Sequence, residues 1–70
     1  MRNTIYDADV ELLARTPKSK RPPIYARIRR EAIVRERARW KRFSRSEAQR
    51  YGRAVLAHVS DRVARIEGER

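Results

Sequence analysis

A chain of 70 residues with 19 Lys and Arg against 9 Asp and Glu carries a formal net charge of +10, and it contains no Cys and a single His. A chain this short buries only about 60% of the surface that it exposes when unfolded, so we expect one domain spanning residues 1–70, without room for a cofactor cavity. The lack of Cys excludes a disulfide framework and a thiolate metal site, and we expect no metal, cofactor or small-molecule substrate. No stretch approaches the roughly 20 apolar residues of a membrane span, so we expect no membrane association and a cytoplasmic location.

The first expected element is a short helix over residues 4–15. Thr4 followed three residues later by Asp7 is similar to a capping box, and Pro17 ends the helical pattern. A polar linker is expected over residues 16–23, because Pro22 and Pro23 lack backbone donors and disfavour helix in the residue before them.

A long helix is expected over residues 24–43, in the part of the chain that holds the excess charge. Residues 17–45 contain twelve Lys and Arg against two Glu, which accounts for the whole net charge. Helical periodicity gives this segment two faces. We interpret the mixed apolar and charged face as a protein-binding face, made of Tyr25, Ile28, Arg29, Glu36, Trp40 and Phe43. The other is a basic face suited to phosphate, made of Arg27, Arg30, Arg37 and Lys41.

A second long helix is expected over residues 45–67. Ser44 and Glu47 have the spacing of a capping box at its start, and Gly68 is typical of a helix end. Its apolar residues recur every three or four positions and form a narrow seam that is expected to pack within the hairpin, in a dimer, or in both. The seam consists of Gly52, Leu56, Val59, Val63 and Ile66.

These elements predict an all-α fold, in which the two long helices form an antiparallel hairpin and the short N-terminal helix covers one end. Small chains without disulfides or metals rarely gain more than about 3 to 5 kcal/mol from their own core, and they commonly oligomerise. We therefore expect a homodimer.

Catalysis has little support in the sequence. His58 lies one helical turn from Asp61, and such a pair is a conceivable general base. A catalytic site also requires a cleft and further convergent groups, however, and a solvent-facing histidine on a helix is the simpler interpretation. We expect no enzyme activity.

Two classes of binding function remain. The basic face favours nucleic acid, because guanidinium groups match phosphate oxygens. Specific base recognition commonly uses Asn and Gln alongside Arg, and the chain has only Asn3 and Gln49. Aromatic residues and Arg are enriched at protein interfaces, so the mixed face favours a protein partner. A host protein partner is the favoured interpretation, and nucleic-acid binding is the alternative.

A family resemblance points the same way. Its features are the length, the basic cysteine-free composition, the linker at Pro22 and Pro23, and the two-helix unit divided at Ser44-Arg45-Ser46-Glu47. In these features the chain resembles small early-expressed proteins of transposable bacteriophages, of the anti-quorum-sensing type. The resemblance implies a short helical dimer that binds and inhibits a host transcription factor and a pilus motor. It covers organisation only, so it assigns no role to any residue of this chain.

Overall fold

The computed structural model describes residues 5–40 and 42–69. It contains three α-helices, α1 (Asp7–Arg15), α2 (Pro22–Arg39) and α3 (Arg45–Gly68), and a short 3-10 helix, η1 (Lys18–Lys20). Over these residues there is no β-strand, and the predicted all-α class is confirmed. No helix in the described ranges is long and apolar enough to cross a membrane.

α1 begins later than the sequence predicts. Its N-cap is Tyr6, which makes no side-chain capping hydrogen bond, and residues 5 and 6 form a turn. Thr4, the expected cap, lies outside the described residues. The late start has a packing reason, since the Tyr6 side chain is only 5% exposed and belongs to the core. At the other end, the Thr16 hydroxyl donates to the carbonyl of Leu12 at 2.6 Å.

The expected linker is more ordered than its composition indicates. It contains η1, and α2 already begins at Pro22, so both prolines lie in the first turn of α2, where a missing amide costs little. Arg21 precedes them and is only 9% exposed. Its Nε donates to the carbonyl of Thr16 at 2.9 Å, and its Nη1 contacts Glu67 Oε1 at 3.1 Å. Arg21 therefore joins the linker to the C-terminal end of α3.

α2 ends at Arg39, whereas the sequence predicts a helix to residue 43. Trp40 has extended backbone angles, φ −112° and ψ 132°. The physical reason is distance: packed helix axes lie about 8–10 Å apart, so a reversal of direction needs several non-helical residues. The connection accordingly occupies residues 40–44, and not the single residue 44 that the expected helices 24–43 and 45–67 leave between them.

The predicted start of α3 is confirmed. The Glu47 backbone N–H donates to the Ser44 hydroxyl oxygen at 3.1 Å, and α3 begins at Arg45. The helix ends at Gly68, one residue beyond the prediction.

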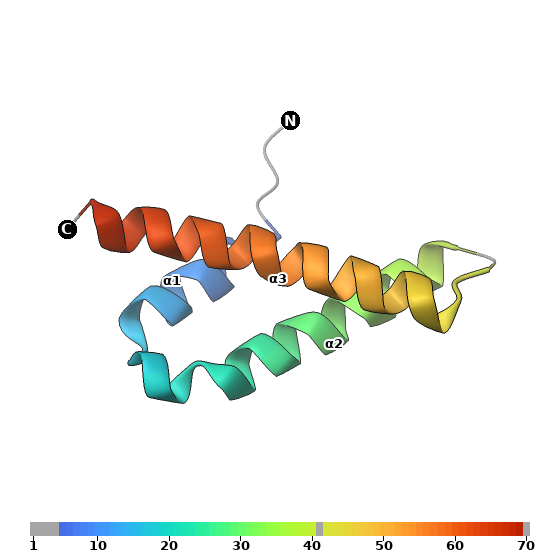
Figure 1. Ribbon diagram of the computed structural model, residues 1–70, viewed down its shortest axis with the longest axis horizontal. Coiled ribbons are helices and arrows are strands. Elements are labelled where there is room, and N and C mark those ends of the chain that lie inside the picture. Colours follow the sequence, from blue (N-terminus) through green and yellow to red (C-terminus); the bar gives the residue numbers. More distant parts are fainter. Residues whose placement is uncertain (1–4, 41, 70) are drawn as a thin grey trace.

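The helices form a flattened molecule measuring 43 × 30 × 15 Å. Figure 1 shows α2 and α3 running in opposite directions from the residue 40–44 connection, close together at that end and spread apart at the other, where α1 lies between them. The largest fully buried side chains all lie where the three helices meet: Val10, Leu13, Ile28, Val59 and Val63. The core is therefore concentrated at the open end of the hairpin.

The seam of α3 packs inside a single chain. Val59 and Val63 are 0% and 1% exposed, and Gly52 is buried, while Leu56 and Ile66 are half-buried against the core. A Cβ at Gly52 would lie 3.0 Å from Arg29 Cγ, so glycine permits a close approach of α2 and α3 at this point. The seam is thus satisfied without a second copy, and the homodimer stays a prediction.

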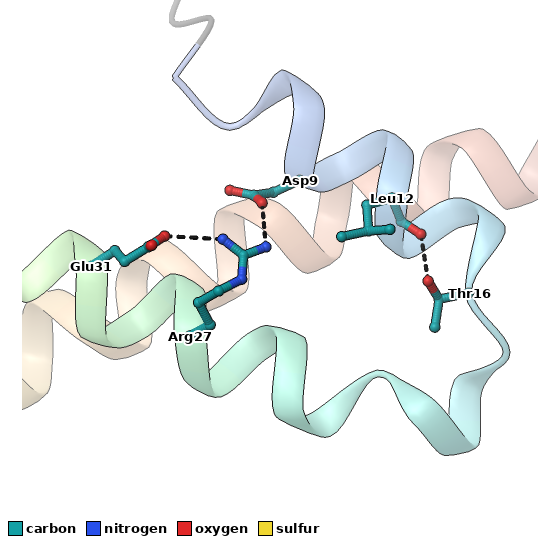
Figure 2. A network of polar contacts seen from close by, with 5 residues as sticks. All are labelled: Asp9, Leu12, Thr16, Arg27 and Glu31. Atoms are coloured by element: carbon teal, nitrogen blue, oxygen red, sulfur yellow. Dashed lines mark hydrogen bonds and ion pairs between the residues drawn. The ribbon is translucent and has the colours of Figure 1, made fainter.

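Two ion pairs hold α1 in the opening of the hairpin. Asp7 Oδ1 lies 2.7 Å from Arg62 Nη2 of α3, and Asp9 Oδ1 lies 2.7 Å from Arg27 Nη2 of α2. Figure 2 shows Arg27 between Asp9 and Glu31, with one nitrogen directed to each carboxylate. α1 is therefore fixed to both arms by charge as well as by its apolar face.

The burial of Val59 makes a first prediction. Val59→Asp places an uncompensated charge in the core, and a domain of this size has only about 3 to 5 kcal/mol to lose, so the variant is expected to unfold. Far-ultraviolet circular dichroism measures the loss of helix. The matched control is Val34→Asp, since Val34 is 64% exposed. A helical Val59→Asp monomer would show that the seam is not the core.

Arg21 makes a second prediction. Arg21→Ala removes the contacts to Thr16 and Glu67 and is expected to lower the free energy of unfolding by about 1.5 to 3 kcal/mol, the range for hydrogen bonds to charged groups. Urea denaturation measures the change. Lys20→Ala, one residue away and exposed, is expected to change it by less than about 0.5 kcal/mol. Equal effects of the two substitutions would contradict the joining role of Arg21.

Candidate functional site

The sequence-predicted protein-binding face is divided by the fold. Ile28 is 1% exposed and lies in the core, so its assignment to a partner surface is corrected: the packing of the three helices covers it. Tyr25 is half-buried against the same core. Arg29 is exposed but rests its side chain beside Gly52. Three of the six residues of this face, Tyr25, Ile28 and Arg29, therefore pack against other parts of the chain.

The other half gathers around the connection. Trp40 is 58% exposed, and its indole N–H donates to Glu36 Oε1, one turn earlier. Phe43 is half-buried and meets the Tyr51 ring edge-on, with 6.3 Å between ring centroids. Trp40 is therefore an accessible aromatic surface and not a core residue.

The predicted basic face also needs a correction. Arg27 is engaged by Asp9 and Glu31, and its hydrogen bond to Asp9 raises the pKa of the guanidinium further. Arg27 therefore acts as a structural ion-pair partner, because α1 places the Asp9 carboxylate beside it (Figure 2). The sequence of α2 alone does not reveal this neighbour. Arg30 and Arg37 are exposed as expected. Lys41 lies outside the described residues.

The hairpin brings additional arginines to the same end of the molecule. We define the hairpin tip as residues 29–53, which run from the contact of Arg29 with Gly52 through the connection and back. All nine arginines of the tip are exposed: Arg29, Arg30, Arg35, Arg37, Arg39, Arg42, Arg45, Arg50 and Arg53. Arg50 and Arg53 come from α3, outside the segment that sequence reasoning considered. Folding the chain back therefore extends the basic surface beyond α2.

Acidic side chains do little to neutralise the tip. It contains Glu31, Glu36 and Glu47. Glu31 pairs with Arg27, outside the tip, and Glu36 accepts from Trp40. The ion pairs of the described residues use Arg21, Arg27 and Arg62, none of which belongs to the tip. The tip arginines are thus available to an anionic ligand.

A pocket of about 320 Å³ lies beside the tip, where the start of the described chain meets both arms. We call it the aromatic pocket, and it is lined by Ile5, Tyr6, Arg35, Arg39, Tyr51, Ala54, Val55 and His58. Sequence reasoning did not find it, because its residues come from three separate segments. One signal was present: Tyr51, Ala54 and His58 share one helical face at spacings of three and four.

Tyr6 organises the pocket. Arg35 Nη2 donates to its hydroxyl at 3.1 Å, and the guanidinium carbon of Arg35 lies 5.4 Å from the centroid of its ring. His58, exposed as expected, meets the Tyr6 ring edge-on at 6.3 Å. Because Tyr6 is almost completely buried, it forms the floor, while Arg35 and His58 stand at the rim.

Tyr51 closes the side of the pocket nearest the connection. Burial, followed by the neighbouring Tyr6 and Glu36, raises the pKa of its hydroxyl from 10 to about 12. The hydroxyl therefore remains a neutral hydrogen-bonding group at physiological pH. Within the described ranges there is no group of three or more His, Cys, Asp or Glu residues that could hold a metal ion.

Comparison with protein-family models, with curated proteins and with solved structures finds no match to this chain. The resemblance to phage proteins therefore stays an expectation, and the function is argued from the chain itself.

Tyr51 makes a third prediction, on pH dependence. Its pKa is raised in the folded state, so its contribution to stability is present below pH 10 and is lost as the pH rises from 10 towards 12. Tyr51→Phe is expected to flatten this decline, measured as the urea midpoint at about pH 9 and about pH 11. Tyr25→Phe, a matched loss of one hydroxyl, is the control. An unchanged decline in Tyr51→Phe would contradict the role assigned to this hydroxyl.

Proposed function

We propose that the protein acts by binding and not by catalysis, and that the hairpin tip binds the phosphate backbone of nucleic acid. The observation that carries this proposal is the set of nine exposed tip arginines, against three glutamates of which two are engaged elsewhere. Guanidinium groups contact phosphate oxygens through two parallel hydrogen bonds, and release of counterions from nucleic acid drives such binding. A cytoplasmic location, in contact with nucleic acid, is part of the proposal.

The expected binding is largely independent of sequence. Direct reading of bases uses Asn and Gln together with Arg, and the tip offers Gln49 as its one amide side chain. α2 and α3, with 18 and 24 residues, are also long for a helix-turn-helix unit that places a short second helix in the major groove. Phosphate contacts position a protein without selecting a sequence.

Salt dependence tests this proposal. If four or more phosphates are neutralised, the slope of log K against log salt concentration is expected to be about −3 on single strands and about −4 or steeper on duplex DNA. Fluorescence anisotropy of labelled oligonucleotides between about 50 and 200 mM salt measures it. The double variant Arg37→Gln, Arg50→Gln is expected to reduce the steepness by about one to two units.

Arg15→Gln is the matched control, because Arg15 is exposed on α1, far along the chain from the tip. It is expected to leave the slope unchanged. Failure of the wild-type protein to bind either a duplex or a single strand at the lower salt concentration would overturn the proposal.

A second candidate function is inhibition of a host protein, as the phage resemblance implies. The exposure of Trp40 favours it, because Trp and Arg are enriched at the energetic centres of protein interfaces. The burial of Ile28 and the packing of Tyr25 leave less of the expected face for a partner, and for this reason we rank it second. A homodimer belongs to the same proposal, and it would have to use surface other than Val59 and Val63.

A further inference from the structure

The aromatic pocket combines two kinds of group, guanidinium cations and aromatic rings. Arg35 and Arg39, one helical turn apart on α2, are exposed at its rim. Tyr51 and His58 supply aromatic rings from α3. A volume of about 320 Å³ is near the lower end of the range for small-molecule sites, about 300–1,000 Å³. The pocket therefore suits a small ligand with an anionic part and a planar part.

We propose that the aromatic pocket binds one nucleotide unit of a single strand, with its phosphate on Arg35 and Arg39 and its base against Tyr51 and His58. This inference rests on the proposed function and deepens it, since it names the form of nucleic acid that the tip prefers. Bases of a duplex are stacked and paired, whereas bases of a single strand can leave the strand and stack on protein side chains.

The geometry around Tyr6 supports the phosphate half of the site. Arg35 uses one N–H on the Tyr6 hydroxyl, and a guanidinium has five N–H donors. The contact with Tyr6 thus fixes the orientation of Arg35 and leaves donors for a ligand. Glu36 of α2 accepts from the Trp40 indole and also neighbours the Tyr51 hydroxyl, but it is not among the residues that line the pocket.

Other small ligands use only half of the site. A simple anion would contact the arginines and gain nothing from the rings of Tyr51 and His58, which already meet Phe43 and Tyr6 edge-on. An apolar side chain would contact the rings and displace water from the arginines without replacing its hydrogen bonds. A nucleotide satisfies both, because every base has a π-face and every linkage has a phosphate.

The first experiment is a titration of the ¹⁵N-labelled full chain with uridine monophosphate, followed by amide chemical shifts. The largest shifts are expected at Ala54, Val55 and His58, which line the pocket. Inorganic phosphate and uridine alone are the controls, and each is expected to bind about tenfold more weakly. Shifts equal to those with inorganic phosphate would reduce the site to an anion site and overturn the proposal, as would no shift at about 10 mM nucleotide.

The second experiment fills the pocket without removing charge. Ala54 is exposed at its wall, and Ala54→Phe is expected to occupy the space of the base. The wild-type protein is expected to bind a single-stranded oligonucleotide about tenfold more tightly than a duplex of equal length at the same salt concentration. Ala54→Phe is expected to lose this preference and to keep the duplex affinity.

Ala64→Phe, an equal substitution at an exposed position nearer the end of α3, is the matched control and is expected to keep the preference. If circular dichroism shows that Ala54→Phe is not folded, His58→Ala replaces it, with a smaller loss of the same preference expected. Equal affinity of the wild-type protein for both forms would overturn the pocket proposal and leave the phosphate-binding function standing. Binding of uridine monophosphate without binding of any oligonucleotide would overturn the phosphate-binding function and leave nucleotide binding by the pocket standing.

Discussion

The fold depends on the packing of α1 into the open end of the hairpin, where three ion pairs reinforce the apolar contacts. Asp7 and Asp9 fix α1 to the two arms, and Glu67 receives Arg21 from the linker. Without α1, two diverging helices would expose the apolar side chains between them, since Val10 and Leu13 complete the core around Val59 and Val63. The short helix is therefore an essential part of the core and not an attached end.

The same ion pairs neutralise arginines at the open end of the hairpin and leave the positive charge of the tip uncompensated. They place carboxylates at the open end and engage Arg21, Arg27 and Arg62 there. The tip, residues 29–53, holds ten Lys and Arg against three Glu, so it carries +7 of the net charge of +10. Charges of one sign gathered on one end of a small molecule attract a polyanion and steer its approach. The ion pairs of the open end and the excess positive charge of the tip are thus two sides of one separation of charge.

Local signals predicted the parts of the fold that local physics decides. The Ser44 cap was predictable because its partner, Glu47, is three residues away. The pairing of Arg27 with Glu31 could be predicted from their i,i+4 spacing in α2, but the pairing of Arg27 with Asp9 and the burial of Ile28 could not, because both depend on where the other helices pack. α2 ends at Arg39 because the chain must cross the distance between two packed helices. The helical pattern of the sequence continues to residue 43 and therefore gives no sign of this end. The aromatic pocket needs Tyr6 beside Arg35, a contact across 29 positions of the chain.

The tip is packed with smaller side chains than the open end, and this difference bears on binding. The buried residues of α3 within the first two turns of the tip are Ala48 and Gly52, whereas Val59 and Val63 fill the open end. Small residues bury little apolar area, and the like charges of the nine tip arginines repel one another, most strongly where they lie within the Debye length of about 8 Å. The tip is therefore the part of the hairpin with the least packing energy to hold it together. A polyanion that neutralised several of these arginines would reduce the repulsion, so the proposed binding would stabilise the folded tip.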